Sequence, residues 1–69
     1  MDDDTCGTIE IVCVDGSVVS FTGNYKDHKK FVVTALENPI VGTVQDNAGF
    51  AVALVVNNIV SIRFKADEA

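Results

Sequence analysis

The sequence predicts a mainly β protein: a small single-domain antiparallel barrel or sandwich of five to six short strands. The chain has 69 residues, which is enough for only one domain. Short runs of β-branched residues recur along it, separated by turn signals such as Asp15-Gly16. Its hydrophobic content of 48% is too high for a disordered chain. We expect one β-domain over residues 7–65, between an acidic flexible tail at 1–6 and a second tail at 66–69.

Residues 8–14 and 17–22 predict the first β-hairpin. Its register follows from the face that has to be buried. A two-residue loop would mix serine and valine beside the isoleucines of the first strand. A three-residue loop, with Ser17 inside the turn and Val14 opposite Val18, avoids this. We therefore predict the longer loop, which gathers one apolar inner face: Ile9, Ile11, Cys13, Val19 and Phe21.

The segment 31–36 (FVVTAL) fits either a strand or a helix. Its Phe-Val-Val-Thr start favours a strand. The lysines before it and Glu37 after it would oppose a helix dipole. As a helix it would instead present one apolar stripe: Phe31, Val32, Ala35 and Leu36. We predict a strand here and keep an α+β fold with one helix at 27–37 as the alternative.

The second half of the chain predicts three more strands, at 40–44, 50–56 and 59–64. Gly42 marks a bend or bulge in the first of them. The layout has a long first hairpin and a tight last turn before a short closing strand. It resembles the small SH3-type and Sm-type barrels, over most of the chain and in architecture alone.

The strand 50–56 (FAVALVV) has no polar side chain, although a half-exposed strand should alternate. Alternation puts its large residues on one face and Ala51, Ala53 and Val55 on the other, which we call the outer strip. An exposed apolar strip is an aggregation risk. We therefore expect a homo-oligomer with the outer strip as its interface, most simply a two-fold dimer. A ring is the alternative, because the Sm-type resemblance implies assembly through strand edges.

The sharpest polar feature of the sequence is YKDHKKF at 25–31. Lysines and aromatic rings together are typical of single-strand nucleic-acid sites. The simpler interpretation makes the aromatic residues core anchors and the lysines a solvated loop, and we favour it. The alternative is a nucleic-acid-binding barrel that uses the basic cluster, defined as Tyr25, Lys26, His28, Lys29 and Lys30, joined in space by Arg63.

The charge distribution also argues against a phosphate-rich partner. The net charge is −5, but half of the acidic residues lie in the two tails, so the body of the chain is neutral. We expect no signal peptide and no membrane span, and hence a cytoplasmic protein.

No motif points to catalysis or to a cofactor. The glycines are scattered, no Cys-x-x-Cys occurs, and one histidine with two distant cysteines is too little for a zinc site. We expect no metal, no cofactor and no enzyme. The function we predict is a non-enzymatic interaction module that binds a protein or a small ligand. A small-ligand or catalytic pocket between subunits is a further alternative.

Overall fold

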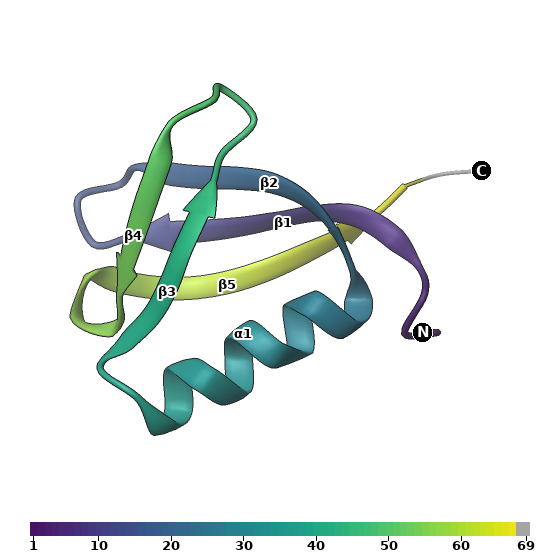
Figure 1. Ribbon diagram of the computed structural model, residues 1–69, viewed down its shortest axis with the longest axis horizontal. Coiled ribbons are helices and arrows are strands. Elements are labelled where there is room, and N and C mark those ends of the chain that lie inside the picture. The colour runs from purple at the N-terminus through teal and green to yellow at the C-terminus, as the bar shows by residue number, and fades with distance from the viewer. Residues whose placement is uncertain (68–69) are drawn as a thin grey trace.

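The computed structural model describes residues 1–67 and shows five strands, one α-helix and one 3₁₀ turn (Figure 1). In chain order these are β1 (Cys6–Cys13), β2 (Val18–Asn24), α1 (Tyr25–Glu37), β3 (Ile40–Gln45), β4 (Ala51–Val55), η1 (Val56–Asn58) and β5 (Ile59–Ala66). Sheet A has the strand order β2-β1-β5, and sheet B pairs β3 with β4. All pairings are antiparallel. The predicted mainly β class is confirmed, but within residues 1–67 the two sheets do not join into a hydrogen-bonded barrel.

The hydrophobic core lies on the inner face of sheet A. Ile9 and Ile11 have no exposed surface, and Phe21 from β2 lies beside them at 8% exposure. Leu54 of β4, which is 2% exposed, completes this cluster from sheet B. Figure 1 shows sheet B crossing sheet A, and α1 runs below sheet A in this view. The inner face predicted from alternation is therefore the face that carries the core.

The first hairpin corrects the predicted register by two residues. Its loop is 14–16 rather than 15–17: the Cys13 amide donates to the Ser17 carbonyl at 2.8 Å, and the Gly16 amide donates to the Cys13 carbonyl at 3.0 Å. Ser17 is held outside the loop because its amide and hydroxyl both donate to the Asp15 carboxylate. A shift of two leaves each side chain on its predicted face, so Ile9 opposes Phe21 and Ile11 opposes Val19.

The sheet B hairpin repeats this turn. The Gly49 amide donates to the Asp46 carbonyl at 3.0 Å, and the Asp46 amide donates to the Phe50 carbonyl at 2.9 Å. Gly16 and Gly49 have φ values of 89° and 92°, the left-handed conformation that ends a three-residue hairpin loop. The predicted bulge at Gly42 is confirmed by a register shift between Ile40 and Gly42.

The predicted strand at 31–36 is wrong, because these residues belong to α1; the alternative with one helix is the correct one. A capping box begins α1. The Asp27 amide donates to the Asn24 side chain at 2.9 Å, and the Asn24 amide donates to the Asp27 carboxylate at 3.4 Å. Asp27 also places a negative charge in the first turn, which counters the lysines that argued for a strand. Phe31 packs edge-on against Phe21, with ring centroids 5.3 Å apart.

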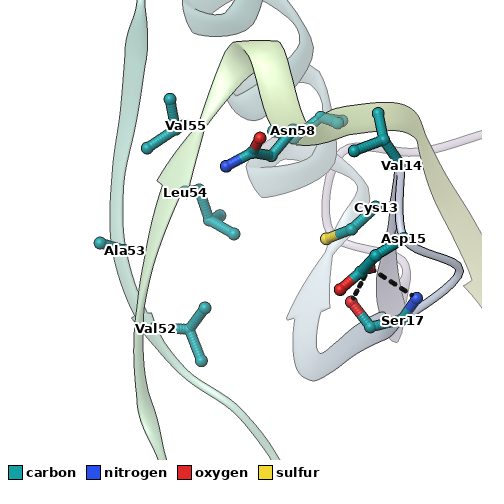
Figure 2. Close-up of a pocket in the computed structure, with 10 residues that line it drawn as sticks. Cys13, Val14, Asp15, Ser17, Val52, Ala53, Leu54, Val55 and Asn58 are labelled. Atoms are coloured by element: carbon teal, nitrogen blue, oxygen red, sulfur yellow. Dashed lines mark hydrogen bonds between the residues drawn. The ribbon is translucent and has the colours of Figure 1, made fainter.

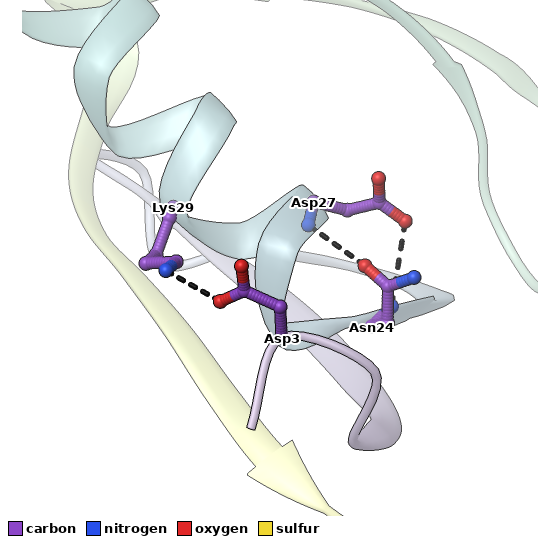
Figure 3. Close-up of polar contacts among 4 residues, drawn as sticks. All are labelled: Asp3, Asn24, Asp27 and Lys29. Carbon is purple, nitrogen blue, oxygen red and sulfur yellow. Dashed lines mark hydrogen bonds and ion pairs between the residues drawn. The ribbon is translucent and has the colours of Figure 1, made fainter. Parts of the chain in front are cut away.

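Residues before β1 complete the cap of α1. The amides of Tyr25 and Lys26 donate to the carbonyls of Thr5 and Asp3, at 2.9 and 3.1 Å. Lys29 forms an ion pair with the Asp3 carboxylate (Figure 3), and this hydrogen bond lowers the pKa of Asp3. The first amides of the helix thus have partners.

At the C-terminal end of the chain, Ala66 of the predicted 66–69 tail lies in β5, while residues 68 and 69 lie outside the described residues.

The inner face of sheet A generates a stability prediction. Phe21→Ala should lower the free energy of unfolding by about 3–5 kcal/mol, because it empties a core position. Glu10→Ala should change it by less than about 0.5 kcal/mol, because Glu10 is half-buried on the opposite face and its partner is the exposed Arg63. Urea unfolding followed by circular dichroism measures both. Equal shifts of the two midpoints would contradict this assignment of faces.

The capping box generates a second prediction. Asn24→Ala should destabilise the protein by about 1 kcal/mol, because the Asp27 amide loses its acceptor. Asn57→Ala in the exposed turn η1 is the control and should change stability by less than about 0.5 kcal/mol. Thermal unfolding monitored by far-ultraviolet circular dichroism distinguishes the two. An Asn24 variant as stable as the control would mean that the cap contributes nothing.

Candidate functional site

The outer strip lies on the side of sheet B that faces away from the core. In the β3–β4 ladder Thr43 opposes Ala53 and Val44 opposes Val52. Val52 and Leu54 point inward, as predicted, and Ala51, Ala53 and Val55 are exposed. Phe50, which was expected on the inner face as well, precedes β4 and is 69% exposed. α1 packs on the core side through Phe31, so it does not cover the outer strip, which stays open within the described chain.

Sheet B carries no charged residue in either strand. Beside the outer strip, Ile40 of β3 opposes Val55 and is 62% exposed. Gln45, which opposes Ala51, and Thr43 also lie on this outward face. Alanines and aliphatic side chains make up the rest, so the face carries no charge, whereas a solvated sheet normally turns mostly polar residues to water. This face therefore has the composition of a surface that another molecule covers.

One long edge of sheet B has free backbone groups. The Asp46–Phe50 hydrogen bond fixes the ladder, so Val44 and Val52 form the next hydrogen-bonded pair. The amide and carbonyl groups of Ala51 and Ala53 then point away from β3, toward the free edge of β4.

The other strand edges of the described chain carry local protection. The Asn47 amide donates to the Ser20 carbonyl on the edge of β2 at 2.9 Å. His28 Nε2 donates to the Ile62 carbonyl on the edge of β5 at 3.1 Å. On β3, the bulge at Gly42 interrupts regular pairing. The edge of β4 has neither a bulge nor a charge.

A recess of ≈ 270 Å³ lies between β4 and the end of the β1–β2 hairpin. Figure 2 shows Val52 and Leu54 pointing into it from β4, with the Cys13 sulfur and the Asn58 amide on other sides. Asp15 and Ser17 form its polar rim. Both cysteines are free, and Cys13 is half-buried in this wall. Sequence alternation could place Cys13 on the inner face but gave no sign of the recess.

The aromatic residues of the basic cluster pack against each other and against β5. Tyr25 and His28 stack with ring centroids 5.8 Å apart. Phe64 lies 5.6 Å from the Tyr25 ring and 5.8 Å from the His28 ring. These contacts agree with the interpretation of the aromatic residues as packing anchors, and they occupy ring surface on which a base would stack.

The basic groups of the predicted nucleic-acid site are divided between two faces. Lys26, Lys29 and Lys30 are exposed on α1, where Lys29 is paired with Asp3. Arg63 does not join them. It lies on the outer face of sheet A, opposite Glu10, with the two charged groups 3.3 Å apart.

The described residues do not assemble the polar groups of a metal or triad site. No group of three metal-ligating side chains occurs within residues 1–67. Ser17 donates to Asp15, whereas the ring of His28 bonds to the Ile62 backbone. In the described part of the chain no helix is long and apolar enough to cross a membrane.

Comparison with known proteins identifies no relative. No family model matches the chain, and no curated protein or solved structure is significantly similar to it.

The placement of the basic cluster generates a prediction about nucleic acid. We expect the protein not to bind a fluorescent single-stranded oligonucleotide in about 50 mM salt, because ring surface is occupied and Arg63 lies on another face. Fluorescence anisotropy is the measurement. Salt-dependent binding that is lost when Lys26, Lys29 and Lys30 are all changed to Gln would overturn this expectation.

Proposed function

We propose that the protein is a non-enzymatic interaction module that self-associates through the outer strip. The observation that supports this is the exposure of Ala51, Ala53 and Val55 on a sheet face without a single charge. The assembled module binds a protein or a small ligand as its partner. The module acts in the cytoplasm.

The small size of the core supports the proposal energetically. Four hydrophobic residues are buried in the described chain: Ile9, Ile11, Phe21 and Leu54. A chain of this length buries only about 60% of its unfolded surface, so its single core is marginal. Association would remove further apolar area from water at roughly 25 cal/mol per Å². Small side chains on the outer strip would let two sheets approach closely.

A two-fold dimer is the simplest assembly, because one self-complementary face satisfies both copies. The strip is flat and lacks charge, so two copies of it would meet without repulsion. A ring remains the alternative and would use strand edges instead of this face.

Ala53→Glu tests the proposed interface. Ala53 lies at the centre of the outer strip, so burial of a carboxylate there would cost several kcal/mol. We expect light scattering at micromolar concentration to show a dimer for the native chain and a monomer for this variant, with the circular dichroism spectrum retained.

The matched control is Thr22→Glu, which adds the same charge at an exposed strand position on sheet A. It should leave the dimer intact. A native protein that scatters as a monomer of 7.4 kDa would refute self-association. A dimer that survives Ala53→Glu would mean that another surface forms it.

A further inference from the structure

We propose that the free edge of β4 and the recess beside it form a docking groove for an extended peptide segment with alternating aliphatic side chains and a basic end. This inference rests on the proposed function and names the chemistry of the partner. The segment would add to sheet B as a new strand.

The first argument is the backbone of β4. The amides and carbonyls of Ala51 and Ala53 point to the free edge, where the described residues offer them no partner. Edges of this kind attract other strands unless charge, proline or a bulge prevents pairing. The bulge at Gly42 protects the outer edge of β3, and hydrogen bonds from Asn47 and His28 protect those of β2 and β5. The outer edge of β4 has no such protection.

The second argument is the recess. An added strand places every second side chain on the inner side of the sheet. Those side chains would enter the recess, where Val52, Leu54 and Ile59 supply apolar contact. A volume of ≈ 270 Å³ accommodates aliphatic side chains of the size of valine. Backbone pairing would thus provide affinity and the recess would provide selectivity.

The third argument is charge. Asp15 is the one charged residue among those that line the recess. Hydrogen bonds from the Ser17 hydroxyl and amide lower the pKa of Asp15, so its carboxylate is ionised at neutral pH. A lysine or arginine at the end of the incoming segment would meet this carboxylate, whereas an acidic residue would be repelled.

The probe is the synthetic peptide acetyl-Lys-Val-Thr-Val-Thr-Val-Lys-amide, titrated into the full-length native protein by calorimetry. We expect saturable binding with a millimolar or tighter Kd. Two N-methylated versions are the matched controls: one methylated on its valines, the other on its threonines. Successive amides of a strand point to opposite edges. One version should therefore lose at least about tenfold in affinity, and the other should bind like the parent.

Charge is tested in the same assay. A peptide with Glu in place of both lysines should bind at least about threefold more weakly, and Asp15→Asn should abolish that difference. Absence of binding at millimolar peptide, or equal effects of the two methylation patterns, would overturn the proposal.

Hydrogen exchange of the free protein covers the remaining outcome. If the amides of Ala51 and Ala53 are already protected from exchange without peptide, a second copy of the chain occupies the edge of β4. That result would also overturn the proposed docking groove. Light scattering reports separately on self-association. A monomeric protein that binds the peptide as described would refute the proposed dimer and leave the groove standing.

Discussion

The contact of Leu54 with Ile9, Ile11 and Phe21 holds this molecule together. Three of these four residues come from the first hairpin. Leu54 is the fully buried residue that sheet B contributes, and the half-buried Val41, Val44 and Val52 of the same sheet pack against the cluster around it. Sheet B forms no ladder with sheet A in the described chain, so side-chain packing, with few backbone hydrogen bonds between loops and edges, fixes the two sheets relative to each other. Once Leu54 points inward, strand alternation turns Ala51, Ala53 and Val55 outward. The open face of sheet B is therefore a consequence of the way the core is built.

The first hairpin shows why faces could be predicted when pairing could not. Alternation has a period of two, so any even shift in register preserves the buried face. The inner face from Ile9 to Phe21 was correct although the loop was placed one residue too late. What decided the loop was local: the Asp15 carboxylate binds the Ser17 amide and hydroxyl, and Gly16 adopts the left-handed conformation. The sequence Asp-Gly-Ser indicates that a turn occurs, but it does not indicate which three residues form the loop.

Helix α1 shows the opposite case, in which local chemistry outweighed the properties of the segment itself. Phe31 to Thr34 prefer a strand, and the lysines oppose the helix dipole. Asn24 and Asp27, three residues apart, supply a capping box, and the carbonyls of Asp3 and Thr5 satisfy further amides. The Asn-x-x-Asp spacing was visible in the sequence. The contribution of the N-terminal residues was not, because it depends on how the chain folds back. The position of Arg63 could not be predicted for the same reason. It depends on the pairing of β5 with β1, which places Arg63 opposite Glu10.

The two surfaces of β4 come from one stretch of chain but are chemically independent. The outer strip consists of side chains that point away from the core, whereas the free edge consists of amides and carbonyls that point sideways in the sheet. A substitution such as Ala53→Glu changes the first and leaves the backbone groups of the second in place. Small residues suit both, because they make the face flat and do not shield the edge. A strand that served only the core would gain nothing from Ala51 and Ala53. The proposed interface and the proposed docking groove on β4 would give a physical reason for the all-apolar run in which these alanines occur.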